Sequence, residues 1–429
     1  MAVVILLGSF FIFLLLGVPI AFSLGLSSLT YILVFLPRVP LSTMAQQVFG
    51  GISSFSNTAI PFFVLVGAIM ESGGISKRLV VFIKNAVGHK KGGIGMIALF
   101  SSCIFASLSG SAIANVAATG CMTIPLMKKN KYPAGLAGAI EASSSSLGAV
   151  IPPSIPFVVY GGLTSISIGH LFIGGYVPGF ILAFALFTML YFQAKKLDVP
   201  VCEKVPSKEV WKSFFSAVPA LLTPIIIMGG ILLGIMTPTE AGAVGCVYAL
   251  IISFFVYKEM KLKDIPKVLL ETAKTTGFVM LVMAIASLFG WVMAFENIPM
   301  RIAAGLVGIL KTPSMFLLGV IILFIIVGTF IDTLSAIIIL GPVLIPAANL
   351  MGIDPLHFGL IMCMSLTFGV LTPPVGTCLF VAAGIAKTTV EDVAKNALPF
   401  TVVIFVLVFV FALFPGLMLW LPRLLGYGG

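Results

Sequence analysis

The chain has 429 residues, of which 60% are hydrophobic and only 9% are charged, and its formal net charge is +10. So little polar surface excludes a water-soluble globule of this length, and a lipid bilayer is the expected solvent. Lys and Arg cluster between the apolar segments without an interleaved aromatic patch, which indicates cytoplasmic loops and excludes a nucleic-acid partner.

Apolar runs long enough to cross about 30 Å of hydrocarbon recur along the whole chain, from residues 2–22 to residues 399–421. They are longer than barrel strands and lack a two-residue alternation, so they predict helices. We therefore expect an all-α polytopic membrane protein with about ten or more membrane segments. The first run could be mistaken for a secretory signal, but no basic residue precedes it and its apolar part is too long, which favours a first membrane helix.

An internal repeat divides the chain. Residues 110–182 align without a gap on residues 331–403, at a constant offset of 221 (331 minus 110). Four of the six prolines in the first stretch coincide with a proline in the second, where chance would give about 0.4. Lysines at 128, 129 and 131 follow the first copy of one segment, whereas the second copy has no basic residue there. Equivalent loops of opposite charge bias predict an inverted repeat, which is typical of secondary transporters.

Each repeat contains two interruptions. Residues 94–127 and 315–350 are apolar runs broken by polar stretches at 107–115 and 328–335, and each run is too long for one crossing and too short for two. We predict a re-entrant helical hairpin in each, with its polar tip near the middle of the membrane. The second interruption is a Gly- and Pro-rich break with paired prolines, at 148–154 and 369–377. Because proline removes N–H donors and cannot continue a helix, each break predicts a discontinuous transmembrane helix.

This pattern divides the chain into four expected stretches. Residues 1–93 are expected to form N-terminal scaffold helices, and 94–192 the hairpin and broken helix of repeat one. Residues 193–314 should hold a cytoplasmic loop with scaffold and connecting helices, and 315–429 the hairpin and broken helix of repeat two with a C-terminal helix.

The broken helices suggest a chemistry. Unpaired carbonyls at membrane depth cost several kcal/mol unless they line a cavity or bind a ligand. Hard cations such as Na⁺ prefer oxygen ligands, and the positive ends of half-helices suit a carboxylate. One site could therefore hold a cation and an anion together. The sequence contains no P-loop and no motif of an intramembrane enzyme, so coupling to an ion gradient is expected and enzymatic activity is not.

Several single residues keep two interpretations. Asp332 lies within an apolar run, which points to an ion pathway, although a helix cap or an ion pair with a neighbouring subunit would also explain it. Glu71 and Glu141 lie near segment ends, where an interfacial position and a functional one are both open. Glu240 follows Thr237 and Pro238 as the acidic residue of a helix first turn, which favours a structural role. The cysteines are interpreted as packing residues, and the histidines have no metal-ligand spacing.

The motifs together resemble a known family. They are Leu-Ser-Gly-Ser-Ala at 108–112, Val-Ile-Pro-Pro-Ser at 150–154, Thr-Pro-Thr-Glu at 237–240 and Gly-Val-Leu-Thr-Pro-Pro-Val-Gly at 369–376. In this order they resemble the large membrane subunit (DctM type) of tripartite ATP-independent periplasmic (TRAP) transporters, of the ion transporter superfamily, over essentially the whole chain.

That resemblance implies a Na⁺-coupled symporter of the elevator type in the bacterial inner membrane, surrounded by membrane lipids. It also implies two partners: a small membrane subunit (DctQ type) and a periplasmic substrate-binding protein that delivers a carboxylate, either sialic acid or a C4-dicarboxylate. A proton-coupled transporter and a passive anion channel remain alternatives.

The resemblance also assigns site residues by position. One Na⁺ site would use Ser109, Gly110, Ser111 and Asn115 with carbonyls from Gly148 to Pro152. The second would use Asp332, Thr333 and Ser335 with carbonyls from Gly369 through Thr372 to Pro373. Weaker candidates for substrate contact are Ser144, Ser146, Ser154, Gly376 and Thr377. The sequence departs from the pattern at Asn115, where a relative that carries sialic acid has an aspartate, so the first site would lose a charge.

Overall fold

Every element of the computed structural model is helical among the residues that it describes, which are all except 1, 54, 91, 198–201, 299, 302–304, 306–309, 311, 374 and 429. Within these residues seven helices are long and apolar enough to cross a membrane, and several shorter apolar helices accompany them. The predicted all-α polytopic membrane fold is confirmed.

The first half contains a five-helix group followed by a hairpin and a broken helix. The group comprises α1 (Ala2–Leu15), α2 (Ile20–Phe35), α3 (Leu41–Ile52), α4 (Ala59–Ser72) and α5 (Ile75–Val87). The hairpin is α6 (Gly93–Ser109) and α7 (Ala112–Lys129). The broken helix is α8 (Ala134–Ser145), the 3-10 turn η2 (Ser146–Ala149) and α9 (Ile155–Thr164), and α10 (Ile168–Leu197) follows.

The second half repeats this order. It begins with α11 (Ser207–Leu232), α12 (Pro238–Ile251) and the long α13 (Ile265–Phe295). Its hairpin is α15 (Pro313–Phe330) and α16 (Thr333–Leu350), and its broken helix is α17 (Pro355–Gly369) and α18 (Thr377–Ala386). The chain ends with α19 (Val390–Leu413) and α20 (Gly416–Leu424).

The repeat extends beyond the segment that the sequence alignment revealed. Adding 221 to the bounds of α7 gives 333–350, which are the bounds of α16. The same shift places α9 on 376–385, which matches the bounds of α18 within one residue. It also pairs α1 with α11, α2 with α12, α3 and α4 with α13, and α10 with α19. The duplication therefore covers nearly every helix, whereas only 110–182 could be aligned from sequence.

The termini of several helices follow from their capping residues. Thr237 and Glu240 form a capping box at the start of α12, so the structural interpretation of Glu240 is confirmed. Asp354 accepts hydrogen bonds from two backbone N–H groups at the start of α17, and Asp332 does the same for α16. At the end of α6, Gly110 adopts the left-handed conformation (φ +60°), which lets the chain reverse into α7.

The two broken helices lie at the centre of the molecule. Every residue of α8 after Ala134 is buried, and so is every residue of α17 after Pro355. By contrast, helices such as α10 and α11 carry exposed Phe and Ile side chains, for example Phe184 and Ile225, as expected of faces that contact lipid. The break in repeat one, residues 150–154, is likewise buried, which is where broken backbone is tolerated at membrane depth, whereas Pro373 in the second break is exposed.

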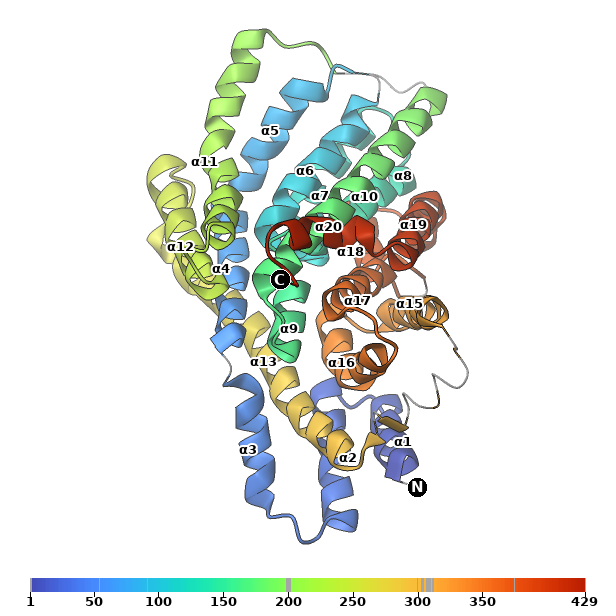
Figure 1. Cartoon of the computed structure of the whole chain (residues 1–429). Coiled ribbons are helices and arrows are strands. Elements are labelled where there is room, and N and C mark those ends of the chain that lie inside the picture. Colours follow the sequence, from blue (N-terminus) through green and yellow to red (C-terminus); the bar gives the residue numbers. More distant parts are fainter. Residues whose placement is uncertain are drawn as a thin grey trace.

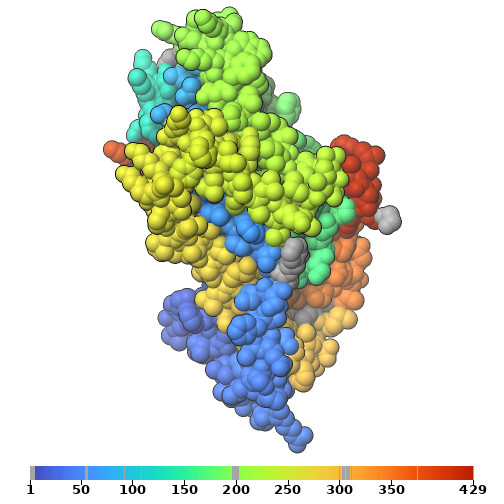
Figure 2. Space-filling view, turned by 90° about the vertical axis from the view of Figure 1, so that its left-hand side faces the viewer, coloured from blue at the N-terminus to red at the C-terminus, as the bar shows by residue number. Residues whose placement is uncertain are grey.

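The basic loops gather at one end. Figure 1 shows the end of α5, the end of α10 and the start of α11 at the top of the molecule, with α1, α2 and α3 at the opposite end. The loop after α5 reaches the segment before α11, because the Cys202 amide donates to the Gly88 carbonyl at 3.0 Å. Lys91, in the basic stretch between α5 and α6, lies outside the described residues. In Figure 2, α11 and α12 cover one face above the blue helix α3.

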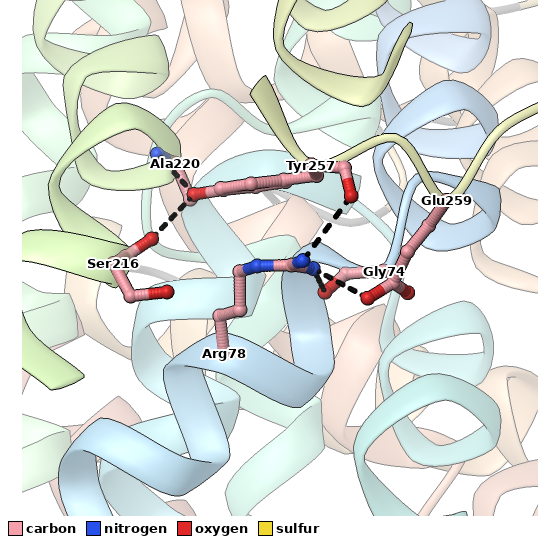
Figure 3. A network of polar contacts seen from close by, with 6 residues as sticks. All are labelled: Gly74, Arg78, Ser216, Ala220, Tyr257 and Glu259. Carbon is pink, nitrogen blue, oxygen red and sulfur yellow. Dashed lines mark hydrogen bonds and ion pairs between the residues drawn. The ribbon is translucent and has the colours of Figure 1, made fainter. Parts of the chain in front are cut away.

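A polar network ties α5 to α11 and to the segment after α12. The pair α4 and α5 bends by 64° at its break, and Arg78 on α5 lies just beyond that bend. Its guanidinium pairs with Glu259 at 2.8 Å, donates to the Gly74 carbonyl at 3.0 Å and lies 3.8 Å from the centre of the Tyr257 ring (Figure 3). The Tyr257 hydroxyl donates in turn to the Ser216 carbonyl of α11. The contacts hold the bent pair against α11 and the segment after α12.

The expected boundaries can be placed on these elements. The first, after residue 93, coincides with the start of α6. The boundary after 192 lies inside α10, and the one after 314 lies in the first turn of α15.

Candidate functional site

A cavity of about 470 Å³ lies where the tips of both hairpins meet α4 and α13. From repeat one it is lined by residues 109–114, with Ala149 of the break and Ile155 and Pro156 at the start of α9. Repeat two contributes Asp332, Thr333, Leu334 and Val370. Glu71 on α4 and Glu271, Thr272 and Thr275 on α13 line the opposite wall. Residues more than 200 positions apart in sequence therefore share one enclosure.

In repeat one, the hairpin tip packs directly on the break. A Cβ atom added at Gly148 would lie 3.1 Å from Asn115 Nδ2 and 3.3 Å from the Ser111 carbonyl oxygen. The Ile155 amide donates to the Gly110 carbonyl at 3.4 Å. The hairpin tip and the break thus share one side of the cavity. Asn115 itself is completely buried behind the tip, and its Nδ2 donates to the Ser102 carbonyl at 3.0 Å.

Repeat two shows the equivalent contact. The Gly376 amide donates to the Thr329 carbonyl at 3.4 Å, as Ile155 donates to Gly110 in repeat one. The backbones also meet closely, because a Cβ added at Gly369 would lie only 2.6 Å from the Cα atom of Gly328. The second hairpin tip and the second break therefore also form one structural unit.

Repeat two additionally contains buried oxygen atoms without partners. The hydroxyls of Ser335, Thr372 and Thr377 are buried and form no hydrogen bond to any described residue. A buried hydroxyl without a partner costs about 1–3 kcal/mol. Thr372 and Thr377 belong to the second break and Ser335 to the first turn of α16, so their hydroxyl oxygens are candidate ligands for a cation.

Asp332 uses one carboxylate oxygen as a helix cap. Its Oδ1 accepts from the Leu334 amide at 3.0 Å and from the Ser335 amide at 3.2 Å. The residue is half-buried and lines the cavity. The cap interpretation is therefore correct for Oδ1, and it leaves the second oxygen of a cavity-lining carboxylate for another ligand.

The other predicted site residues lie outside the cavity lining. The buried hydroxyls of Ser146 and Ser154 donate to the carbonyls of Ser143 and Ala149, at 2.7 and 2.6 Å. Ser144 is buried in α8, the Pro152 ring packs near Gly175 of α10, and Pro373 lies in the exposed turn after α17. Its neighbour Pro374 lies outside the described residues.

Two features were missed or misplaced by sequence reasoning. The α13 wall of the cavity was not predicted, although its polar residues at 271–276 stand out in an otherwise apolar helix. The interfacial interpretation of Glu141 is wrong, because the residue lies within α8 and is 0% exposed. Its hydroxyl partners lie on three helices and are far apart in sequence, so the sequence could not show that they converge.

The contact between Gly369 and Gly328 gives a testable prediction. Gly369→Ala is expected to destabilise the protein by about 1–3 kcal/mol, because the added methyl group would overlap backbone rather than a movable side chain. Thermal unfolding of the purified protein in detergent should show a lower melting temperature. Gly384→Ala is the matched control, since nothing lies within 4 Å of its Cβ position on α18. Equal melting temperatures for the two variants would contradict the close packing.

These features define a class: an all-α multi-pass membrane protein in which two repeated units place broken helices around one cavity. The chain belongs to the DctM component family of tripartite ATP-independent periplasmic transporters, whose family model matches residues 7–417. The predicted resemblance is confirmed. The chain is accordingly a transporter component and not an enzyme, and it resides in the bacterial inner membrane.

Individual relatives and a solved structure agree with this assignment. The C4-dicarboxylate TRAP transporter large permease protein DctM of Pseudomonas aeruginosa is 40% identical, over 94% of each chain. The sialic acid TRAP transporter large permease protein SiaM of Vibrio cholerae is 39% identical, over 96% of each chain. The solved structure of MtrF of Neisseria gonorrhoeae, described as one of a class of antimetabolite efflux pumps, superposes with a TM-score of 0.63. It is 13% identical, over 89% of this chain and 84% of its own, and supports the fold alone.

Proposed function

We propose that this chain is the large membrane subunit of a Na⁺-coupled symporter that takes up a carboxylate. The observation that carries the proposal is one cavity lined by both hairpin tips, with the Asp332 carboxylate in its wall. Buried hydroxyls without a described partner in the second break and in the first turn of α16 support it.

Two cation sites follow from the two units. The first would draw on the Ser109 to Ser111 tip, Asn115 and the backbone at Gly148. The second would combine Asp332 and Thr333 with the hydroxyls of Ser335 and Thr372. Hydroxyl, carboxylate and carbonyl oxygens are the ligands that hard monovalent and divalent cations prefer. The donor sets fit Na⁺, and the carboxylate in the second site gives it the stronger electrostatic attraction.

The cavity also suits an anion. Three helices begin at its wall, namely α7, α9 and α16, and the first residues of each line it. The positive ends of these helix dipoles favour a carboxylate. The names of the two relatives include sialic acid and C4-dicarboxylate, which are both carboxylates. We propose a substrate of the same chemical class.

Partners and motion complete the proposal. As one component of a tripartite system, the chain would work with a small DctQ-type membrane subunit and a periplasmic substrate-binding protein. The hairpins and broken helices would move together against α4 and α13 as an elevator, which carries the cavity from one side of the membrane to the other. The cavity lies between these two groups of helices, which supports their division into a moving group and a fixed group.

Reconstituted uptake tests the proposal. Proteoliposomes containing this chain, the small subunit and the binding protein should accumulate a carboxylate against its gradient when Na⁺ is supplied outside, and K⁺ in its place should abolish accumulation. Undiminished uptake in K⁺ that follows a proton gradient would overturn Na⁺ coupling in favour of the proton-coupled alternative. Flux that never exceeds equilibration would indicate a passive channel.

A further inference from the structure

Glu141 lies at the centre of a buried polar cluster that the proposed cation sites do not use. Its carboxyl group accepts from the Ser145 hydroxyl at 3.0 Å and from the Ser102 hydroxyl at 3.1 Å. The hydroxyls of Thr119 and Thr123 also contact it, one at each carboxyl oxygen. These partners come from α6, α7 and α8, so the carboxyl group is enclosed between three helices of repeat one.

No cation compensates this carboxyl group among the described residues. The ion pairs of the described chain join Arg78 to Glu259 and Arg423 to Asp354, and neither includes Glu141.

The helices packed against α8 offer no ion-pair partner either among their described residues. They are α6, α7, α10, α18 and α19. Their described titratable and charged side chains are Cys103 on α6, Cys121, Lys128 and Lys129 on α7, His170, Tyr176, Tyr191 and Lys195 on α10, Cys378 on α18, and Glu391, Asp392 and Lys395 on α19. None of them forms an ion pair with Glu141, and the Lys128 ammonium instead donates to the Ala386 carbonyl. An ionised Glu141 would be a buried, unpaired charge, which costs several kcal/mol.

The neighbouring hydroxyls fit a neutral acid. The Thr123 hydroxyl lies 3.0 Å from the Thr119 carbonyl, to which it can donate its single proton. A protonated Oε2 of Glu141 can then donate to Thr123 Oγ1, while Ser145 and Ser102 donate to Oε1. The Ser145 and Ser102 hydroxyls lie 3.0 and 3.1 Å from Oε1, which are ordinary hydrogen-bond distances. Hydrogen bonds therefore account for the contacts of the carboxyl group, and the group that this cluster accommodates is a proton.

Comparison of the repeats indicates that the fold does not require this cluster. The positions 221 residues after Ser102, Thr119, Thr123, Glu141 and Ser145 are Leu323, Leu340, Leu344, Met362 and Leu366. Repeat two thus builds the same hairpin and broken helix with apolar side chains alone. Because burying five polar side chains brings no folding advantage over leucine, their presence in repeat one points to a function.

The cluster is linked to Asn115 through shared partners. Thr119 Oγ1 lies 3.3 Å from Asn115 Oδ1 and also contacts the Glu141 carboxyl group. The Ser102 and Ser145 carbonyls accept from Asn115 Nδ2, while the hydroxyls of the same two serines contact Glu141. Thr119 has one hydroxyl proton, and the acceptors within its reach are the Asn115 backbone carbonyl at 2.7 Å, Asn115 Oδ1 and the Glu141 carboxyl group. An ionised Glu141 is the strongest of these acceptors and draws the proton away from both Asn115 oxygens, so Asn115 Oδ1 becomes free to bind a cation.

We propose that Glu141 is a proton-binding site in repeat one, and that release of its proton raises the affinity of the Asn115 site for Na⁺. The inference rests on the proposed Na⁺ coupling. Proton release has two consequences in the same direction: it adds a negative charge behind the site, and it frees the amide oxygen. The carboxylate that the first site lacks is thereby supplied from α8, but only when it has lost its proton.

The test measures the Na⁺ concentration for half-maximal uptake as a function of pH in the reconstituted system. In the wild-type protein this concentration should fall as pH rises, by up to about tenfold per pH unit for a single linked proton. Glu141→Gln keeps the hydrogen bonds but cannot lose a proton, so its Na⁺ requirement should stay at the acidic limit at every pH. Glu391→Gln, an exposed carboxylate on α19, should retain the wild-type pH dependence. A wild-type pH dependence in Glu141→Gln would overturn the proposal.

An infrared measurement keeps the proposal testable without transport. The C=O stretch of a neutral, buried carboxylic acid should be present in the purified wild-type protein, should be lost in Glu141→Gln and should shift in Glu141→Asp. Absence of a band that responds to either variant would refute proton binding at Glu141. If uptake proves independent of Na⁺, the proposed function fails, while this band still decides whether Glu141 carries a proton.

Discussion

Asp332→Asn is expected to raise the Na⁺ concentration for half-maximal uptake by roughly 10- to 100-fold, since a hydrogen bond or ligand contact to a charged group contributes about 1.5–3 kcal/mol. Asp332 is the only carboxylate that the two hairpin tips bring to the cavity wall among the described residues. Uptake measured over a range of Na⁺ concentrations would show the effect, and the maximal rate at saturating Na⁺ should change less than the Na⁺ requirement.

Asp332→Asn removes the negative charge but keeps the helix cap. Asparagine is as good an N-cap as aspartate, so α16 should keep its start. Asp354→Asn is the matched control, because Asp354 caps α17 through the same pair of backbone hydrogen bonds, at 2.9 and 3.2 Å, yet does not line the cavity. A wild-type Na⁺ requirement in Asp332→Asn would remove this residue from the cation site. An equal loss in Asp354→Asn, which keeps its cap but removes the ion pair to Arg423, would show that the effect is not specific to charge at the cavity.

Much of the fold could be predicted because its breaks have local causes. The reversal at Gly110 and the interruption before Ile155 are visible in sequence, since Gly readily adopts the left-handed conformation of a reversal and paired Pro cannot continue a helix. Their recurrence 221 residues later identified the duplication. The wider repeat, which pairs α1 with α11 and α2 with α12, was not visible. Any apolar side chain satisfies a lipid-facing helix, so those segments have no motif by which to align them.

The candidate site was predicted only where it is local. Ser111 and Asp332 occupy equivalent hairpin tips, and both line the cavity. Glu271 lies opposite them on α13, and this contact depends on tertiary packing that no sequence pattern encodes. The burial of Glu141 could not be predicted for a related reason. Its partners Ser102 and Thr123 lie in separate helices, so the enclosure of the carboxyl group becomes evident only when the helices are packed.

The two repeats share a scaffold but differ in charge. Repeat two has a carboxylate at its tip, Asp332, whereas the equivalent Ser111 is neutral and the nearby Asn115 is an amide. In repeat one the carboxylate lies one layer deeper, at Glu141, and the hydroxyl of Thr119 connects it to Asn115. The proposed first site would therefore respond to pH through Glu141.

A disulfide between the two groups of helices is expected to stop transport if the elevator proposal is correct. A Cβ atom at Gly290 on α13 would lie 3.6 Å from the Cβ atom of Pro342 on α16, within the range of about 3.5–4.5 Å that disulfides adopt. In a background without the six native cysteines, all of which are unpaired, the double variant Gly290→Cys with Pro342→Cys should form the bond on oxidation. Uptake should fall to the level of empty liposomes, because hairpin two would be fixed to α13.

Reduction distinguishes locking from damage. A reducing agent should restore uptake in the double variant, and each single cysteine variant should transport equally well with and without oxidant. The bond can be quantified by the change in gel mobility after cleavage between residues 290 and 342. Full uptake by protein in which the bond is complete would show that α16 need not move relative to α13. Transport would then have to use a motion within one group of helices, such as opening of a hairpin tip, and the cavity wall formed by α4 and α13 would be a static part of the site.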